Sequence, residues 1–222
     1  MDSNKDQSYF LWQVRKEQLP HILFPVGGMQ KTEVRRLAKK FGLTTADKKD
    51  SQGLCFVGKV DMKEFLSHYI KPRRGNVLDA RGRIIGVHNG VFFYTIGERL
   101  GLPTRSDLVS GKRPDLVVAG PCYVIDKDTR KNTLTVSHKG PSGTLPVAQK
   151  EILIEDCNWL VPPVSGSEYQ ARVRYRQPPQ NAKIKNQKAK WVVCFERPQT
   201  IASGQSLVLY DGNVVVGGGI IC

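Results

Sequence analysis

The sequence predicts an α+β protein with a short helical N-terminal part, a small mixed central domain and a C-terminal antiparallel β-barrel. Apolar residues recur at helical spacing only within the first seventy residues. From Gly75 onward, short apolar runs alternate with turn formers, and five strand-like runs occupy the last third. We therefore expect three domains, at residues 1–60, 61–143 and 144–222.

The N-terminal part contains one clear amphipathic helix. Its apolar face is formed by residues at positions i, i+3, i+4 and i+7, namely Val34, Leu37, Ala38 and Phe41. Thr32 is placed to cap this helix and Gly42 to end it. The opposite face is basic, with Arg35, Arg36, Lys39 and Lys40, and we interpret it as a solvated face. Met62 to Ile70 predicts a second, shorter helix.

In the central domain, the spacing of apolar residues changes from helical to strand-like. Arg81-Gly82 separates two apolar stretches between Asn76 and Val87, which predicts a hairpin. Further strands are expected at Val91–Ile96, Cys122–Asp126 and Thr133–Val136. The polar segment from Pro103 to Gly120 is predicted to be a long loop.

The last third is all-β in character, with turn formers between its strand-like runs. These runs are Glu151–Trp159, Tyr169–Tyr175, Ala189–Phe195, Ser206–Tyr210 and Val214–Ile221. Short strands with glycine-rich corners predict a small barrel. Gly217-Gly218-Gly219 is expected to mark a bend or the close approach of another backbone.

The chain is strongly basic. It has 34 Lys and Arg against 20 Asp and Glu, a formal net charge of +14. Such a surplus favours a polyanionic partner such as nucleic acid, although excess lysine can also serve solubility alone. No apolar run reaches the length of a membrane helix and no signal peptide is evident, so we expect a soluble, cytoplasmic protein without a membrane partner.

Cys55 is the cysteine in the most informative setting. The five cysteines have no C-x-x-C spacing, and the four histidines are scattered, which argues against a disulfide framework and against a metal site. Cys55 follows Lys48 and Lys49, and cationic neighbours favour a reactive thiolate. The alternative is a buried apolar residue among Leu54, Phe56 and Val57. The remaining cysteines are interpreted as structural or incidental: Cys122, Cys157, Cys194 and Cys222.

A second candidate site lies in the barrel. Arg172, Arg174 and Arg176 alternate along a predicted strand, so their side chains would share one face and could follow phosphates. Tyr175 could stack on a base. An exposed face paired with acids is the alternative. The sequence has no G-x-x-x-x-G-K-[ST] and no G-x-G-x-x-G motif, so it predicts no ATP site within this chain.

Six stretches taken together resemble the MnmA-type tRNA-specific 2-thiouridylases. They occur in the family's order and at similar spacing: Asn4–Leu11, Leu23–Gly27, Asp50–Gly58, Tyr94–Arg99, Arg174–Gln177 and Gly217–Ile221. The resemblance covers nearly all of this chain but only the latter part of the family's chain. The family's N-terminal PP-loop domain holds ATP phosphate and a first catalytic cysteine, and neither that loop nor that cysteine has a counterpart in the sequence. Residues 1–60 correspond to the C-terminal remnant of this domain, with the Cys55 loop. The resemblance therefore implies a C-terminal portion that is inactive alone.

The resemblance also implies a chemistry and its residues. ATP activates C2 of the wobble uridine, position 34 of tRNA, and a cysteine persulfide delivers sulfur to that carbon. The persulfide cysteine corresponds to Cys55, is loaded by a sulfur-relay donor protein, and can end in a disulfide with the first cysteine. Contacts to tRNA correspond to Lys5, Asp6, Gln7, Arg174, Tyr175 and Gln205. No metal is implied. The alternative reading is a non-enzymatic basic β-barrel that binds RNA.

Overall fold

The computed structural model describes residues 2, 5–48, 61–102, 120–139, 143, 145–187 and 190–222. The chain divides into two compact units. The barrel unit comprises Met1–Lys59, Glu151–Arg197 and Ser203–Cys222, and the central unit comprises Val60–Lys150 and Pro198–Ala202. Few helices accompany two sheets, which confirms the α+β class. The division into three domains stays a prediction.

The N-terminal part of the barrel unit is helical. Its elements are the 3-10 helices η1 (Ser8–Leu11) and η2 (Lys16–His21), followed by the α-helix α1 (Lys31–Lys40). Gly42 ends α1 as predicted: with φ of 64°, it lets Leu43 N donate to Ala38 O at 2.9 Å. The predicted cap was wrong, because Thr32 lies inside the helix and Gln30 is the N-cap residue.

The basic face of α1 is satisfied locally. Arg36 approaches Glu33 at 3.9 Å, Lys39 pairs with Asp47 at 2.9 Å, and Arg35 donates to the backbone oxygen of Ala46 at 3.1 Å. These partners agree with the interpretation of a solvated face. Exposed ion pairs of this kind add little stability, typically below about 1 kcal/mol each.

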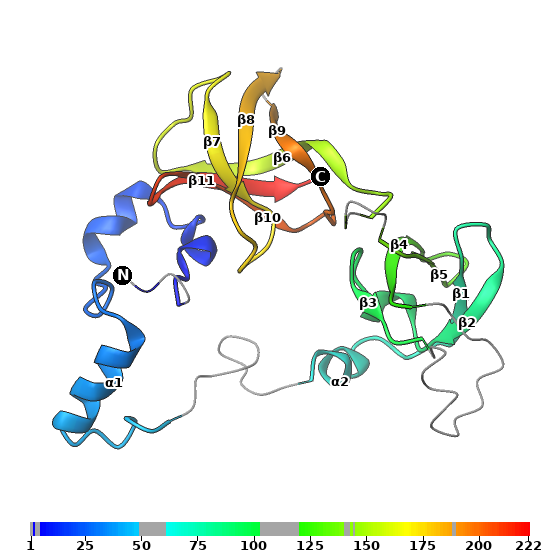
Figure 1. The fold of residues 1–222 in the computed structure, drawn as a ribbon, viewed down its shortest axis with the longest axis horizontal. Coiled ribbons are helices and arrows are strands. Elements are labelled where there is room, and N and C mark those ends of the chain that lie inside the picture. The colour runs from blue at the N-terminus through cyan, green and yellow to red at the C-terminus, as the bar shows by residue number, and fades with distance from the viewer. Residues whose placement is uncertain are drawn as a thin grey trace. The chain divides into compact units, whose positions relative to one another are not determined.

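The C-terminal barrel is closed and has six strands in the order β10-β11-β6-β9-β8-β7 (Figure 1). The strands are β6 (Gln149–Trp159), β7 (Glu168–Arg172), β8 (Gln180–Gln187), β9 (Lys190–Gln199), β10 (Ser206–Asp211) and β11 (Val214–Ile221). The predicted barrel is confirmed, but β8 was missed. Only Ala182 and Ile184 of β8 are buried, so its apolar signal is two residues long.

Glycines in β11 allow neighbouring strands to come close, as the sequence predicted. A Cβ atom on Gly217 would lie 2.2 Å from the backbone oxygen of Asn158. A Cβ atom on Gly218 would lie 2.5 Å from that of Leu207. Real Cβ atoms do not approach so closely, so these positions require glycine.

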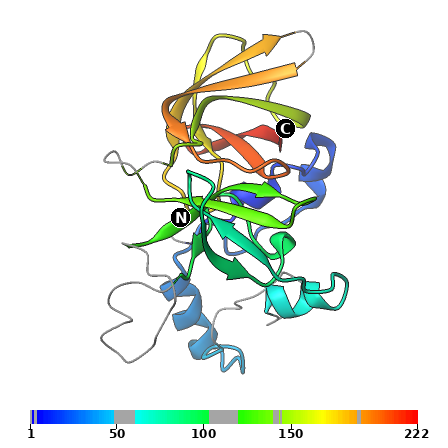
Figure 2. The ribbon, with the colours of Figure 1, turned by 90° about the vertical axis from the view of Figure 1, so that its right-hand side faces the viewer.

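The central unit is built on a five-stranded sheet of order β2-β1-β5-β4-β3, with α2 beside it (Figure 2). Its elements are α2 (Met62–Ser67), β1 (Gly75–Leu78), β2 (Ile84–His88), η3 (Val91–Phe93), β3 (Arg99–Leu100), β4 (Cys122–Asp128) and β5 (Thr133–Ser137). Strands β1 and β5 pair in parallel, and the other neighbours are antiparallel. Val77, Val124 and Leu134 are fully buried in its core.

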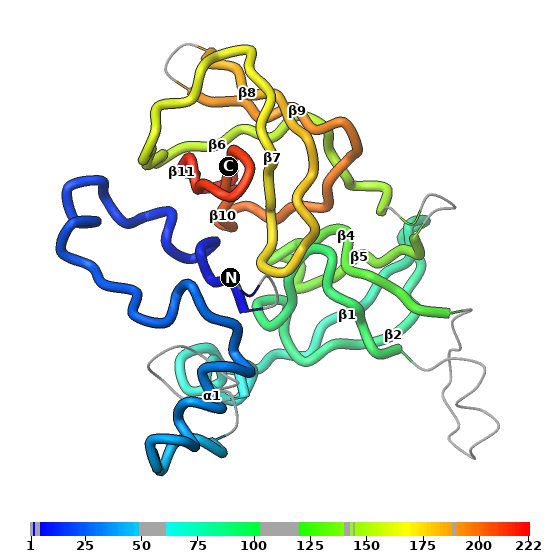
Figure 3. The backbone as a smooth tube through the Cα atoms, turned by 60° about the vertical axis from the view of Figure 1, so that its left-hand side comes forward, coloured from blue at the N-terminus to red at the C-terminus, as the bar shows by residue number. Residues whose placement is uncertain are grey.

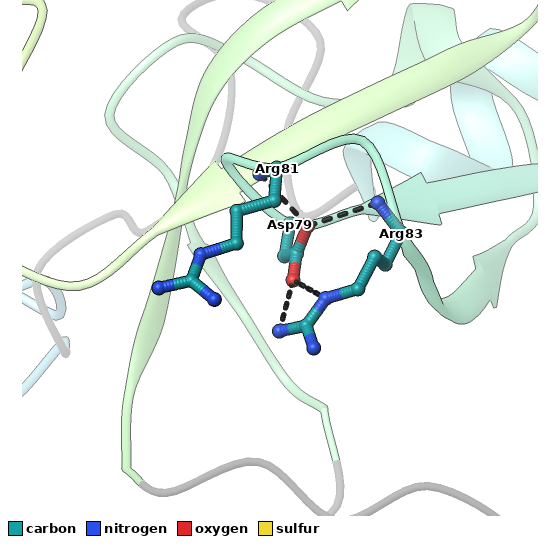
Figure 4. Close-up of polar contacts among 3 residues, drawn as sticks. All are labelled: Asp79, Arg81 and Arg83. Atoms are coloured by element: carbon teal, nitrogen blue, oxygen red, sulfur yellow. Dashed lines mark hydrogen bonds and ion pairs between the residues drawn. The ribbon is translucent and has the colours of Figure 1, made fainter.

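The predicted hairpin is formed by β1 and β2 and is closed by Asp79 (Figure 4). The Asp79 carboxylate accepts from the backbone N–H groups of Arg81 and Arg83, each at 2.9 Å, and from Arg83 Nε at 2.7 Å. These bonds, led by the Arg83 backbone N–H, lower the pKa of Asp79. The side chain of Arg81 points away from the carboxylate (Figure 4).

The strand predicted at Val91–Ile96 is not formed, because its backbone groups form hydrogen bonds with side chains instead of with a neighbouring strand. Residues Val91–Phe93 form η3 instead. Val91 N donates to Asn132 Oδ1 at 3.3 Å, and Lys127 Nζ donates to the backbone oxygen of Tyr94 at 2.7 Å. Gly90, at φ of 141°, turns the chain out of the extended direction.

The sequence predicted neither a membrane helix nor a metal site. No helix in the described residues is long and apolar enough to cross a membrane. Within the same ranges, no group of three or more His, Cys, Asp or Glu side chains could hold a metal ion. The predicted loop falls outside the description except for Gly120.

Candidate nucleic-acid interface

The N-terminal segment packs directly on the barrel, beside β10 and β11 (Figure 3). Tyr9 of η1 and Trp12 form one buried cluster with Val208 and Tyr210 of β10. Tyr9 is 7% exposed and Trp12 is 3% exposed. Strand β10 is therefore buried on both faces, since Leu207 and Leu209 are also fully buried.

Hydrogen bonds fix this packing. Asn158 of β6 donates through Nδ2 to the backbone oxygens of Trp12 at 2.7 Å and Val14 at 3.0 Å. The Tyr9 hydroxyl donates to the backbone oxygen of Ser206 at 2.8 Å. The residues joined are 146, 144 and 197 positions apart in sequence. Segments from the two ends of the chain thus become one surface.

Aromatic rings continue from the buried cluster to the exterior. Phe10, which is 57% exposed, lies 4.6 Å from the ring of Tyr175, and Tyr9 lies 6.3 Å from it. The guanidinium of Arg176 sits 5.4 Å from the Tyr175 ring, and that of Arg172 sits 5.1 Å from the Tyr210 ring. Of these rings Phe10 is exposed, Tyr175 is half-buried and Tyr210 is buried, so Phe10 and Tyr175 are the ones that could stack on bases, with guanidinium groups nearby to hold phosphates.

The predicted arrangement of the three arginines was wrong in part. Strand β7 ends at Arg172, and the chain then turns, with Arg176 at φ of 64°. Arg174 and Arg176 therefore leave the strand and do not share a strand face with Arg172. Val173 is buried in the barrel, which fixes the start of this turn.

The first predicted motif lies at the start of η1. Asp6 accepts from the backbone N–H of Ser8 at 2.9 Å and from its hydroxyl at 3.0 Å. Gln7 is the N-cap residue, and its backbone oxygen accepts from Phe10 N at 3.0 Å. Lys5 and Gln7 are exposed, so their side chains are accessible to a ligand.

Electrostatic coupling shows that the separated motifs meet around η1. Burial, then Tyr210, raises the pKa of Tyr9 to about 12, and Arg174 acts in the opposite direction. Burial also raises the pKa of Tyr210, on which Asp6, Ser8 and Arg172 act as well. Asp6 and Arg174 are thus within electrostatic reach of one tyrosine pair.

Buried polar atoms without a hydrogen-bond partner among the described residues occur on this surface. Among them are Arg172 Nε and Gln205 Oε1. The backbone oxygen of Gln205 accepts from Ile221 N at 2.8 Å, and the next residue, Ser206, accepts from Tyr9. Buried polar atoms normally have partners, so this pair marks a surface suited to an additional polar ligand.

The sequence did not identify five residues as parts of this interface: Tyr9, Phe10, Trp12, Tyr210 and Asn158. A usable signal existed for the first three, because aromatic residues directly follow the motif at Lys5 to Gln7. Nothing local identified Tyr210 or Asn158, whose importance comes from contacts across the whole chain.

Cys55 lies outside the described residues, so its predicted role is not tested. The described cysteines, Cys122, Cys157, Cys194 and Cys222, are free. Burial is the first cause that raises the thiol pKa of each, and it raises that of Cys157 to about 11, with Asp156 and Cys222 adding to the effect. Raised pKa values disfavour the thiolate, as expected of structural cysteines.

Three family models match consecutive parts of the chain. They are described as the tRNA methyl transferase HUP domain at residues 1–59, the tRNA methyl transferase PRC-barrel domain at 63–138 and the aminomethyltransferase beta-barrel domain at 149–221. Proteins named tRNA-specific 2-thiouridylase MnmA are also similar. The relative from Shewanella sp. (strain MR-7) is 40% identical over 100% of this chain and 58% of its own length. The chain belongs to the MnmA-type family.

Other members of the MnmA-type family show the same extent of similarity. Relatives from Stenotrophomonas maltophilia (strain K279a) and Xanthomonas campestris pv. campestris (strain B100) are each 42% identical over 99% of this chain and 57% of their own length. The chain thus spans somewhat more than half the length of these relatives. The barrel unit combines the segments matched by the first and third family models.

Proposed function

We propose that this chain supplies the tRNA-holding surface and the sulfur-carrying cysteine of a 2-thiouridylase that acts in the cytoplasm. One observation carries the proposal: three of the residues proposed as tRNA contacts, from both ends of the sequence, lie near η1 and β10. Asp6 acts on Tyr210, Arg174 acts on Tyr9, and Tyr175 packs on Phe10. The names of the relatives, tRNA-specific 2-thiouridylase, favour tRNA as the polyanion.

The chemistry of this surface suits a nucleic acid. Arg172, Arg174 and Arg176 offer cationic donors for phosphate oxygens, and Tyr175 with Phe10 offers ring faces for bases. Gln205 Oε1 is an acceptor for a hydroxyl or an amine of the RNA. We assign Lys5, Asp6 and Gln7 to the edge of the same contact.

Sulfur transfer is assigned to Cys55. Its thiolate attacks the outer sulfur of a donor protein's persulfide, which leaves a thiolate on the donor and a persulfide on Cys55. The outer sulfur of that persulfide then attacks C2 of the wobble uridine, whose C2 oxygen has been adenylated by ATP, and AMP leaves with that oxygen. The S–S bond to Cys55 breaks when the thiolate of the family's first cysteine attacks Cys55, which leaves the sulfur on the uridine and a disulfide between the two cysteines. ATP is the co-substrate that activates C2, and no phosphate-cradling loop is seen in the described residues. We therefore assign ATP binding to parts of the enzyme that this chain does not contain, and we expect the chain to be inactive alone.

The tRNA-holding role can be tested on this chain by fluorescence anisotropy with labelled tRNA at several salt concentrations. Arg174→Ala should weaken binding several-fold and lower the salt slope by about 1, because one phosphate contact is lost. Arg130→Ala, in the β4–β5 turn, removes the same charge from an exposed site and should change neither. Equal effects of the two substitutions would refute the site.

The stacking role needs a separate comparison. Tyr175→Leu should weaken tRNA binding by roughly five- to tenfold, at the low end of the range for loss of one base-stacking ring. Tyr175→Phe keeps the ring and should bind like the parent. If both substitutions leave affinity unchanged, Tyr175 does not touch the RNA.

The sulfur-carrying role is tested in the complete enzyme. Cys55→Ser should abolish 2-thiouridine formation while leaving tRNA affinity unchanged. Cys194→Ser is the matched control and should retain activity, since that thiol is partly buried and has a raised pKa. Full activity of the Cys55→Ser enzyme would leave the alternative reading, an RNA-binding barrel without a catalytic thiol.

A further inference from the structure

The central unit contains a second basic and aromatic site that the proposed function does not use. A cavity of about 380 Å³ opens between α2, the segment before β1, and η3. Its lining includes Lys63, Arg74, Asn89, Phe93 and Tyr94, and no acidic side chain of the described residues lines it. The volume lies within the range of small-molecule sites and suits one nucleotide.

The walls of the cavity are held by a buried polar network. Asn132 donates through Nδ2 to the backbone oxygens of Arg73 at 3.0 Å and Arg74 at 2.9 Å, and its Oδ1 accepts from Val91 N. His88, 2% exposed, lies with Nε2 3.1 Å from the backbone oxygen of Asn132. One amide side chain therefore joins both walls, which keeps the site formed without a ligand.

The aromatic wall is positioned by a glycine. Gly90 has φ of 141°, and a Cβ atom there would lie 2.8 Å from the ring of Phe93. The absence of a side chain at Gly90 thus allows the Phe93 ring to lie against the backbone. Tyr94 is held in turn by Lys127, which donates to its backbone oxygen at 2.7 Å.

No acidic side chain of the described residues pairs with the cationic groups of the cavity. Lys63 Nζ lies 4.7 Å from the centre of the Tyr94 ring, and neither Lys63 nor Arg74 forms an ion pair with a residue in the described ranges. Two acids lie near Lys63 in the sequence, Asp61 and Glu64, and neither lines the cavity. Asp61 is engaged in capping α2 through Lys63 N at 2.8 Å and Glu64 N at 3.0 Å. Two cations beside two rings match a phosphate attached to a planar base.

We propose that this cavity binds one nucleotide of an RNA strand, with its phosphate on Lys63 and Arg74 and its base against Phe93. Asn89 supplies an amide that can donate to and accept from the base edge. The inference rests on the proposed function, because an RNA substrate supplies the nucleotide. A free mononucleotide has the same chemistry, and the experiment separates the two sources.

The test uses the full chain and a fluorescent hexauridylate, with binding followed by anisotropy. Arg74→Ala should weaken binding at least fivefold and lower the salt slope by about 0.7, the value for one phosphate of a single strand. Arg81→Ala removes the same charge from the β1–β2 turn, outside the cavity, and should stay within twofold of the parent. Phe93→Leu should weaken binding about fivefold, whereas Phe92→Leu, at an exposed neighbouring ring, should not.

Three outcomes decide the proposal. The proposal is overturned if Arg74→Ala binds hexauridylate within twofold of the parent. This outcome does not depend on Phe93→Leu, which a thermal melt could show to be unfolded. It is also overturned if uridine monophosphate binds in an Arg74-dependent manner while hexauridylate binding is independent of Arg74. It is supported if hexauridylate alone depends on Arg74.

Failure of the barrel interface gives a different pattern. In that case Arg174→Ala and Tyr175→Leu would leave tRNA affinity unchanged, while Arg74→Ala would still lower hexauridylate affinity. If only the cavity proposal fails, the barrel substitutions weaken tRNA binding and Arg74→Ala has no effect on hexauridylate.

Discussion

Removal of the single hydroxyl of Tyr9 tests how η1 is held on the barrel. The hydroxyl donates to the backbone oxygen of Ser206 at 2.8 Å, and the residue is 7% exposed. A buried neutral hydrogen bond contributes about 1 kcal/mol net to stability. Tyr9→Phe should therefore lower the free energy of unfolding of the barrel unit by about 1 kcal/mol at pH 7.

The stability deficit of Tyr9→Phe should disappear at high pH. Burial raises the pKa of Tyr9 from its ordinary 10.0 to about 12. Between these values the unfolded chain binds fewer protons than the folded one, so stability is full below pH 10 and falls as pH rises through about 12. The loss at pH 11 is about 1.3 kcal/mol for a shift of this size. Phenylalanine has no proton to lose, so the deficit of Tyr9→Phe should vanish by pH 11.

Urea unfolding at pH 7, 9 and 11 measures this difference. The three tryptophans are Trp12, Trp159 and Trp191, all in the barrel unit, so fluorescence reports that unit. Subtracting the two proteins cancels the titration of groups that are not coupled to Tyr9, whereas Tyr210 is coupled to it. Tyr69→Phe, at a residue of the central unit that is 75% exposed, removes a hydroxyl outside the barrel unit and should leave the fluorescence transition unchanged at every pH. A deficit for Tyr9→Phe that is the same at pH 11 as at pH 7 would refute the reasoning.

Three further predictions concern packing and polar networks. Gly218→Ala should destabilise the barrel by about 3 kcal/mol or prevent folding, because its Cβ atom would meet the backbone oxygen of Leu207 at 2.5 Å. Thermal melts measure this effect. Gly28→Ala, at a position in open space, is the control and should melt close to the parent. Burial lowers the pKa of His88, so NMR titration of its ring should give a pKa below 6.5. The free energy of unfolding should fall as pH drops from 6.5 toward that pKa, because only the unfolded chain binds the proton in this range. A ring pKa at or above 6.5 would contradict this prediction. Asn158→Leu leaves two backbone oxygens without their donor and should cost about 1–3 kcal/mol in urea unfolding, with unchanged stability as the contrary result.

Local patterns predicted the elements whose signals are local. The helix ended by Gly42 and the hairpin turning at Gly82 were found because periodicity and a glycine at positive φ act within a few residues. Strand β8 was missed because only two of its residues face the core. The strand predicted at Val91–Ile96 failed because Asn132, about forty positions away, takes its backbone donor.

The candidate interface could be predicted as a set of residues but not as a surface. The alternating arginines and the resemblance both pointed to Arg174, and the resemblance alone supplied Asp6 and Gln205, without saying how these residues are arranged. Their proximity depends on η1 packing against β10, through contacts between residues up to 197 positions apart. Sequence separation of this size leaves no periodic trace, and the buried partners Tyr210 and Asn158 carry no mark of their role.

If the barrel unit binds RNA as proposed, docking of η1 on the barrel makes that binding and the folding of this unit interdependent. A ligand that touches both Asp6 and Arg174 binds only the docked state, so it must stabilise that state by RT ln(1 + [L]/Kd), about 2.7 kcal/mol at one hundred times Kd. The buried Arg172 Nε and Gln205 Oε1, which have no partner among the described residues, act in the same direction. Their desolvation cost is already present in the free protein, and partners on the RNA would recover it. On the proposed function, this surface is preformed, and part of the binding free energy would come from partners for polar atoms that have none among the described residues.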